Sequence, residues 1–185
     1  MKNPRLAFRY ANALYDFSLE TGDVENVFQD IVRIQETIAA NKELKPVLES
    51  PVIPKDKKQN IIKGIFQKNV SEITLQFFTL IVKKSRVPQL LMICKQFIKI
   101  YYKNHNIKEA FITSAQPLSE EKIQYLKNYL EKTFTYSFIF HLSVNPRIIG
   151  GIIIKIDDSF YDASIQTKIN KLKAEFSQNA YAVGF

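Results

Sequence analysis

The fold of the second half of the chain is decided by residues 145–172, which read NPRIIGGIIIKIDDSFYDASIQTKINKL. The β-branched run at residues 152–156 predicts a strand, and the tight Asp157-Asp158-Ser159 turn predicts a hairpin into a second strand. Helical spacing follows, with apolar side chains at Ile165, Ile169, Leu172 and Phe176. We expect this last amphipathic helix to close the domain.

Two further strands are predicted upstream of this stretch. Residues 107–113 are too few for a free-standing helix and rich in β-branched side chains, and residues 138–144 also read as a strand. Between them Ser119 introduces a helix whose two leading glutamates complement the N-terminal dipole. The side chains expected to pack inward from this helix are Ile123, Leu126, Tyr129 and Leu130. Residues 106–185 are therefore predicted to form a small α/β domain.

The first hundred residues predict helices, because their apolar side chains recur at three- and four-residue steps. Asn3 is a cap followed by proline at the first helical position, and Gly22 ends that helix. Asp23 is expected to cap the second helix, and Pro88 to start the last long one. Six helices with such short connections are expected to stack as an antiparallel bundle over residues 1–105. The predicted class is α+β, with a six-helix bundle followed by a small α/β domain.

The composition indicates a folded, soluble chain, since 46% of its 185 residues are hydrophobic. The longest uninterrupted apolar stretches fall far short of the ~20 residues that cross a bilayer. Lys2, Arg5 and Arg9 leave no room for a secretory apolar region, so we expect a cytoplasmic location. The one cysteine, Cys94, lies in an apolar run and is expected to be a buried thiol.

The net charge of +8 is concentrated in one stretch. Residues 51–105 carry 11 basic and 2 acidic side chains, whereas residues 1–50 carry 6 and 8. Clustered lysines are typical of nucleic-acid or membrane-surface binding, so a basic adaptor that uses residues 51–105 is one interpretation. The lysines are scattered, however, and no aromatic RNA-binding strand accompanies them. We favour lysines on solvent-facing helix surfaces and an acidic protein partner, with no nucleic acid bound.

Few residues are arranged for chemistry. The chain has five glycines and no phosphate-binding loop, and its two histidines belong to no metal-ligand array. Counting from Asp157, a calcium loop would need glycine at Asp162 and glutamate at Lys168. We expect no cofactor, no metal and no catalytic residue. The weaker alternative is an enzyme built around His141 with Asp157, Asp158 and Asp162.

Three stretches together resemble the delta subunit of F-type ATP synthases, called the oligomycin sensitivity-conferring protein in mitochondria. Arg9-Tyr10-Ala11-Asn12-Ala13-Leu14-Tyr15 is similar to the family's opening R-Y-A-x-A-L/F-F/Y, and Ser85-Arg86 is similar to its K/N-G-R corner. The third and most specific stretch is residues 145–172, which resembles the family's D/N-P-x-L/I-I-G-G strand, turn, I-D-G-S and basic helix. The resemblance covers essentially the whole chain.

Three positions depart from the family pattern. Ala163 stands where D-G-S has glycine, Asp157 replaces the glycine of the usual Gly-Asp turn, and Ser85 replaces the glycine before Arg86. Each change bears on a backbone angle, and none removes a reactive group. The motif residues carried over from the family, which we expect to set local shape, are Arg86, Gly150, Gly151, Asp162 and Ser164.

The resemblance implies a stator subunit and not an enzyme. Residues 1–105 would bind the catalytic head and residues 106–185 would link to the b subunits of the peripheral stalk, so that rotation is coupled to proton translocation and ATP synthesis. The location implied is the cytoplasmic side of the bacterial inner membrane, with membrane association only through the complex.

A partner-binding groove is also implied. In the family, an amphipathic N-terminal helix of the alpha subunit lies between the first and fifth helices. The residues carried over to this groove are Tyr10, Ala13, Leu14 and Phe17 on one wall, and Phe77, Phe78, Ile81 and Val82 on the other. A helical bundle needs apolar stripes in any case, so the sequence leaves open which of these side chains are core.

Overall fold

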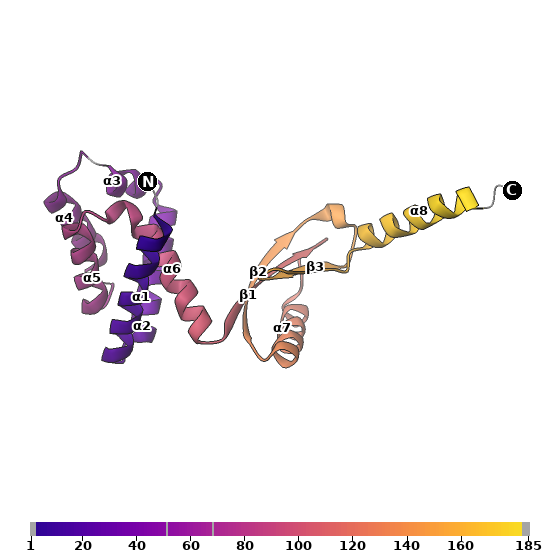
Figure 1. Cartoon of the computed structure of the whole chain (residues 1–185), viewed down its shortest axis with the longest axis horizontal. Helices are drawn as coiled ribbons and strands as arrows, with labels where there is room; N and C mark the ends of the chain where they lie inside the picture. Colours follow the sequence, from indigo (N-terminus) through magenta and orange to yellow (C-terminus); the bar gives the residue numbers. More distant parts are fainter. Residues whose placement is uncertain (1–2, 51, 68, 183–185) are drawn as a thin grey trace. The chain divides into compact units, whose positions relative to one another are not determined.

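The computed structural model describes residues 3–50, 52–67 and 69–182 of the chain. The chain separates into two compact units, Met1–Asn104 and His105–Phe185 (Figure 1). Within the described residues the first unit is helical, and the second combines a four-stranded sheet with helices, so the predicted α+β class is confirmed. No helix in these ranges is both long and apolar enough to cross a bilayer.

The first unit is organised around α6, which packs against both α1 and α2, while α5 packs against α4 and α2. Its elements are α1 (Pro4–Thr21), α2 (Val24–Ala40), α3 (Leu44–Glu49), α4 (Lys55–Phe66), α5 (Glu72–Lys83), the short 3-10 helix η1 (Val87–Gln89) and α6 (Leu90–Asn104). Fully buried side chains of this core include Ile31, Ile34, Phe78, Ile81, Ile93 and Phe97. The stripes predicted from helical spacing therefore meet in one interior.

The ends of α1 follow from its sequence. The Asn3 side chain accepts a hydrogen bond from the Leu6 amide at 3.2 Å, and Gly22 adopts a left-handed φ of 74° that lets its own amide bond the Leu19 carbonyl. The prediction for Asp23 is wrong in one respect. It precedes α2, but its side chain makes no capping bond to the backbone and accepts from the Asn26 side chain instead.

A buried carboxylate joins α2 to α5. Asp30 accepts hydrogen bonds from the Ser71 amide at 2.7 Å and from the Thr74 hydroxyl at 2.9 Å. These groups lie at the N-terminus of α5, where the helix dipole favours a negative charge. Arg33, one turn further along α2, donates to the Asn69 carbonyl at 2.6 Å. The loop before α5 is thus anchored to α2 at two points.

Lys58 corrects the expectation that the lysines of the basic stretch face solvent. Its side chain lies in the interior, with 7% of the residue exposed, and its Nζ donates to the Ser50 carbonyl at 2.5 Å. Ser50 is the residue that ends α3. The ammonium group therefore satisfies a carbonyl at the end of one helix from a position on the next.

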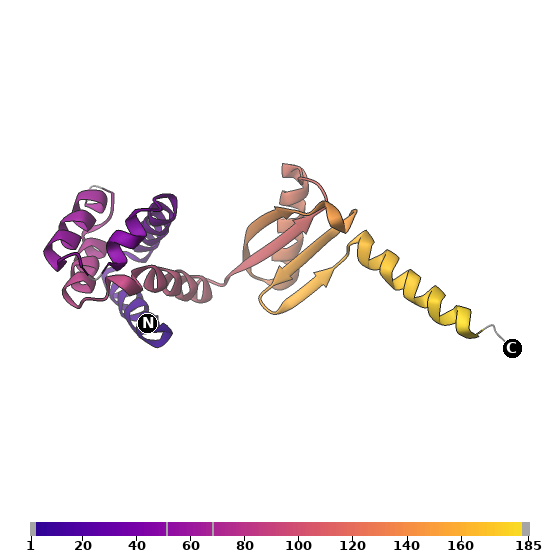
Figure 2. The same cartoon turned by 90° about the horizontal axis from the view of Figure 1, so that it is seen from above.

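The second unit is a mixed sheet with α7 packed on one face (Figure 2). Its elements are β1 (Ile107–Ser114), α7 (Glu120–Phe134), β2 (Ser137–Val144), η2 (Pro146–Ile148), β3 (Ile152–Ile156), β4 (Ser159–Asp162) and α8 (Ile165–Ala182). The strand order is β2-β1-β3-β4, with β1 parallel to β2 and antiparallel to β3. Ala110, Leu130, Phe138 and Ile156 form the core between sheet and helix.

Two expectations about this unit are wrong. Tyr129 of α7 is 59% exposed and does not pack inward, although Leu130 beside it is buried. The last helix, α8, does not close the domain, because Leu172 and Phe176 on its apolar stripe are 51% and 73% exposed. Among the described residues, α8 contacts the rest of the unit chiefly at η2, and the Ile165 amide at its start donates to the Gly150 carbonyl.

Candidate functional site

The helix α1 has a partly uncovered apolar flank. Its buried face is made of Ala7, Ala11, Leu14, Tyr15 and Ser18. Beside that face, Leu6, Tyr10, Ala13 and Phe17 recur at steps of four, three and four residues, and they are half-buried or exposed. Phe17 is 47% exposed. Phe8, also exposed, falls on the opposite flank by the 100° rotation per helical residue.

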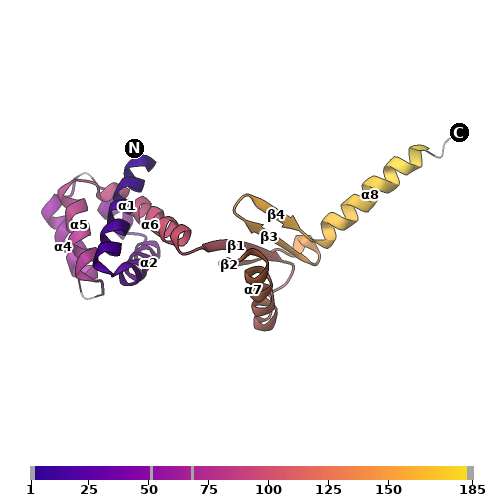
Figure 3. The same cartoon turned by 60° about the horizontal axis from the view of Figure 1, so that its bottom comes forward.

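A similar stripe lies on α5. Ile73 and Phe77 are half-buried and Leu80 is 42% exposed, at steps of four and three residues. Figures 1 and 3 both show α1 and α5 as neighbours, with α4 on the far side of α5. Sequence reasoning named Phe77 but missed Ile73 and Leu80, although the same helical spacing would have found them.

Four of the predicted groove residues lie in the core of the first unit. Leu14, Phe78, Ile81 and Val82 are each no more than 3% exposed. Tyr10, Ala13, Phe17 and Phe77 are the members with surface that a partner could touch. These four side chains pack in the core beneath α1 and α5. They therefore affect the apolar stripes only indirectly, by holding the two helices in position.

The corner after α5 depends on a left-handed residue. Ser85 has φ of 57°, and its amide and that of Arg86 bond the carbonyls of Val82 and Ile81, each at 2.9 Å. This pattern closes the helix end in the way that glycine usually does. The Arg86 side chain is exposed.

The paired glycines form a tight junction between β3 and the chain that enters α8. A Cβ on Gly151, whose φ is 76°, would lie 2.2 Å from the Ala163 carbonyl oxygen. A Cβ on Gly150 would lie 2.6 Å from Cδ1 of Ile165. The Ile165 amide also bonds the Gly150 carbonyl at 2.9 Å. Both glycines are therefore places where another segment approaches the backbone closely.

Asp162 and Ser164 build the start of α8. The Asp162 carboxylate accepts from the Ser164 amide and the Thr167 hydroxyl, both at 2.8 Å, while the Ser164 hydroxyl accepts from the Thr167 amide at 3.2 Å. Hydrogen bonds from Ser164, and then from Thr167, hold the pKa of Asp162 below its ordinary value. Ser164 is itself buried. The arrangement is a helix cap.

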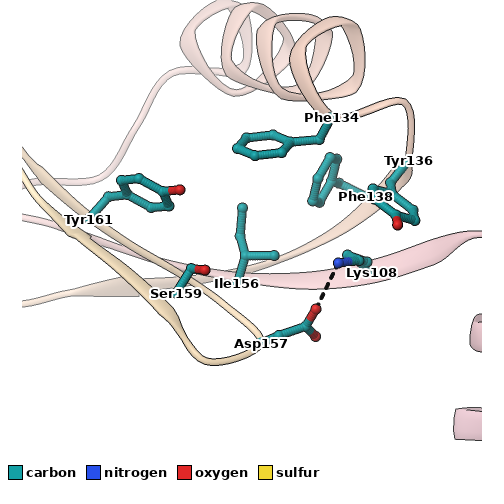
Figure 4. A pocket seen from close by; sticks show the side chains of 8 residues that line it. All are labelled: Lys108, Phe134, Tyr136, Phe138, Ile156, Asp157, Ser159 and Tyr161. Carbon is teal, nitrogen blue, oxygen red and sulfur yellow. Dashed lines mark ion pairs between the residues drawn. The ribbon is translucent and has the colours of Figure 1, made fainter.

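A small apolar pocket of about 70 Å³ lies between the end of α7 and the β3–β4 turn (Figure 4). Phe134 and Phe138 face Ile156 across it, and Lys108 pairs with Asp157 at 2.9 Å on its edge. Lys108 also lies 4.2 Å from the Tyr136 ring centroid. Asp157 has φ of 49°, at the turn position where the family usually has glycine. Sites for cofactors and other organic ligands are several times larger, about 300 Å³ or more.

The residues of the weaker enzyme alternative lie in separate interactions. His141 contacts Glu109 at 2.9 Å and stacks on Phe111, whereas Asp157 pairs with Lys108 and Asp162 caps α8. Among the described residues, no group of three or more histidine, cysteine, aspartate or glutamate side chains could hold a metal ion.

Cys94 is buried, as predicted. Burial raises the pKa of its thiol to about 12, which leaves it unreactive as a nucleophile.

Exposed apolar side chains at helical spacing on α1, α5 and α8 define an α+β protein built for contact with other chains.

Comparisons with known proteins agree with this class. The sequence profile of the family described as "ATP synthase delta (OSCP) subunit" matches residues 6–176. Similar proteins include the ATP synthase subunit delta of Salinibacter ruber, 32% identical with 93% of each chain covered. That of Cytophaga hutchinsonii is 29% identical, with 96% of this chain and 97% of the relative covered.

A chain in the cryo-EM structure of the Toxoplasma gondii mitochondrial ATP synthase hexamer has the same fold, with a TM-score of 0.70 at 17% identity. The similarity covers 92% of this chain and 97% of that one. This chain belongs to the ATP synthase delta (OSCP) subunit family. It is therefore a non-catalytic peripheral-stalk subunit of an F-type ATP synthase and a peripheral component of that membrane-associated complex.

Proposed function

We propose that the first unit acts as a six-helix bundle that holds the catalytic head, by accepting an amphipathic N-terminal helix of the alpha subunit between α1 and α5. The observation that carries this proposal is the pair of apolar stripes on neighbouring helices. Leu6, Tyr10, Ala13 and Phe17 line one side, and Ile73, Phe77 and Leu80 the other. A helix laid between them would cover side chains that water now contacts.

The residue types suit a helical guest. Tyr10, Phe17 and Phe77 supply large contact areas at low cost in side-chain entropy, as in many interface hot spots. Ala13 leaves room for the guest backbone to approach closely. Beneath them the buried side chains of Leu14 and Phe78 keep the two helices in place.

The second unit is proposed to link to the b subunits of the stalk. The apolar stripe of α8 supports this assignment, since Leu172 and Phe176 lie uncovered among the described residues and an amphipathic helix favours burial of its apolar face. The complex would lie on the cytoplasmic side of the bacterial inner membrane.

The mechanical role follows from rotary synthesis. A shaft that turns inside the head exerts a torque on the head, and the head must be held still for that torque to drive synthesis. A brace needs slow dissociation and no active site. An interface of roughly 1,600 Å² with aromatic anchors can reach nanomolar affinity, about −12 kcal/mol.

The groove is tested with Tyr10→Asp in the full chain. A charge on the stripe should weaken binding to a synthetic peptide of the alpha-subunit N-terminus by at least roughly tenfold, because the aspartate would be desolvated on binding. Phe8→Asp is the matched control, since Phe8 is exposed on the opposite flank of α1. Equal dissociation constants for both folded variants and the unaltered chain would contradict the groove.

The bracing role is tested in the assembled complex. Removing this subunit should leave ATP hydrolysis by the free head intact and abolish proton-driven synthesis. A parallel loss of hydrolysis by the isolated head would contradict a purely mechanical role.

A further inference from the structure

Lys58 has an environment that sets it apart from its neighbours on α4. Lys55 and Lys57 are exposed, whereas Lys58 is buried and directed to the Ser50 carbonyl. Among the described residues the ion pairs are Lys108 with Asp157 and His141 with Glu109, so no carboxylate in this part of the chain lies within ion-pair distance of the Lys58 ammonium, although Glu49 lines the same cavity. An ammonium group has three donors and buried charges are normally paired, so this group can accept a further anionic partner.

A cavity of about 290 Å³ opens beside this lysine. It lies between the end of α3, the start of α4 and the corner that joins α5 to η1. Lys55 and Lys58 supply positive charge to its lining, and Glu49 supplies the single carboxylate. The remaining lining is mostly apolar and comes from Ile53, Val82, Val87 and Pro88.

Charge around the cavity favours an anion. Lys83, Lys84 and Arg86 are exposed at the corner whose Ser85 lines the cavity, and residues 51–105 carry 11 basic against 2 acidic side chains. Such a field steers acidic groups toward the surface. The apolar lining is unsuited to a free phosphate, which needs many donors, but it suits the methylene groups of an acidic side chain.

We propose that this cavity binds an aspartate or glutamate side chain of a head subunit, with its carboxylate on the Lys58 ammonium. The inference rests on the proposed function, because it takes the head as the partner. It adds a second attachment point on the first unit, formed by α3, α4 and the α5–η1 corner. Contact there is polar and specific, in contrast to the apolar stripes of α1 and α5.

The test measures binding of the full chain to a purified catalytic head stripped of this subunit. Lys58→Met removes the buried charge, and Lys55→Glu reverses the exposed charge at the cavity. Lys57→Glu is the matched control, because Lys57 is exposed on the same helix and does not line the cavity. We expect Lys58→Met to bind roughly tenfold to a hundredfold more weakly, as when a desolvated charge pair loses one partner. Lys55→Glu should bind roughly twofold to fivefold more weakly, because a reversed charge on an exposed side chain repels the incoming carboxylate. The control should bind as the unaltered chain does.

Lys58→Met could also loosen α3, so its melting temperature is measured beside its affinity. Lys55→Glu keeps the test decisive, since an exposed side chain contributes little to folding. Unchanged affinity for Lys55→Glu, or for folded Lys58→Met, overturns the cavity proposal. The melting temperature of the unaltered chain is also measured in millimolar inorganic phosphate. A rise in that temperature, with head binding unchanged in both variants, would overturn the proposal in favour of a small-anion site.

The two proposals fail separately. Loss of head binding in Tyr10→Asp with normal binding by both cavity variants supports the groove and overturns the cavity. Normal binding by Tyr10→Asp with weak binding by both cavity variants overturns the groove and supports the cavity.

Discussion

Asp30 and Thr74 lie 44 residues apart in the chain, yet the Thr74 hydroxyl donates a hydrogen bond to the Asp30 carboxylate at 2.9 Å in the interior of the first unit. Asp30 also accepts from the Ser71 amide, so one side chain of α2 holds the N-terminus of α5. Because α5 carries one of the two apolar stripes, this contact helps to set where that stripe lies relative to its neighbours.

We expect Asp30→Ala to lower the free energy of unfolding of the chain's first unit by roughly 2–4 kcal/mol, because two donors near a helix N-terminus lose a charged acceptor. Urea denaturation followed by circular dichroism measures the change. Glu36→Ala, an exposed substitution on the same helix, should change it by less than about 0.5 kcal/mol. Equal effects of the two substitutions would show that the hydrogen bonds to Asp30 add no more to the free energy of unfolding than an exposed side chain does.

Ser85→Gly should stabilise the first unit by roughly 0.5–1 kcal/mol, since serine at a left-handed φ is strained and glycine is not. Ser71→Gly is the opposite case, because Ser71 has φ of −63° and caps α5 with its hydroxyl. That substitution should destabilise the unit. A higher thermal midpoint for Ser85→Gly and a lower one for Ser71→Gly would confirm that Ser85 is strained at its left-handed φ. A lower midpoint for both variants would refute it.

Gly151→Ala should cost at least roughly 3 kcal/mol in the second unit, because its Cβ would strike a backbone oxygen at a left-handed residue. Gly150→Ala meets only the mobile end of Ile165, so we expect a cost of about 1 kcal/mol. Combining Gly150→Ala with Ile165→Val, which removes Cδ1, should recover most of that loss. Additive destabilisation in the double variant would contradict the contact.

The start of α8 should depend on pH through Asp162. Its pKa is lowered in the folded chain, so its stabilising contribution is present above the unfolded pKa of about 3.9 and is lost as pH falls through the folded pKa. Amide exchange at Thr167 and Lys168, followed by NMR on lowering the pH, should show the first turn opening. Asp162→Asn should lose this pH dependence, and an unchanged profile in that variant would assign it to another group.

Helix boundaries could be predicted closely from the sequence because their causes are local. Asn3, Pro4 and Gly22 act on the backbone within one turn of where they lie, so the extent of α1 needs no tertiary contact. The same is true of the Asp157 turn between β3 and β4. The apolar residues Ile31, Ile34 and Ile38 of α2 also lie at helical spacing, and all three are buried.

What the sequence could not decide is which apolar stripes are covered. Tyr129 and Leu130 both read as inward, and α8 has an apolar stripe like that of α2, yet Tyr129, Leu172 and Phe176 are exposed. Spacing gives the direction of a side chain from its own helix axis, whereas burial depends on whether another element lies there. The same reason explains why half of the predicted groove residues lie in the core.

By itself, the sequence determined the order of helices and strands, the glycine-dependent turns and the family, because these depend on neighbouring residues and on motif order. Only the tertiary structure decided that Asp30 and Lys58 are buried charges at helix ends, and that one flank of α1 stays partly open beside α5. Whether a charge is buried or an apolar surface is exposed depends on which segments, distant in the sequence, pack around that residue. No local pattern encodes them.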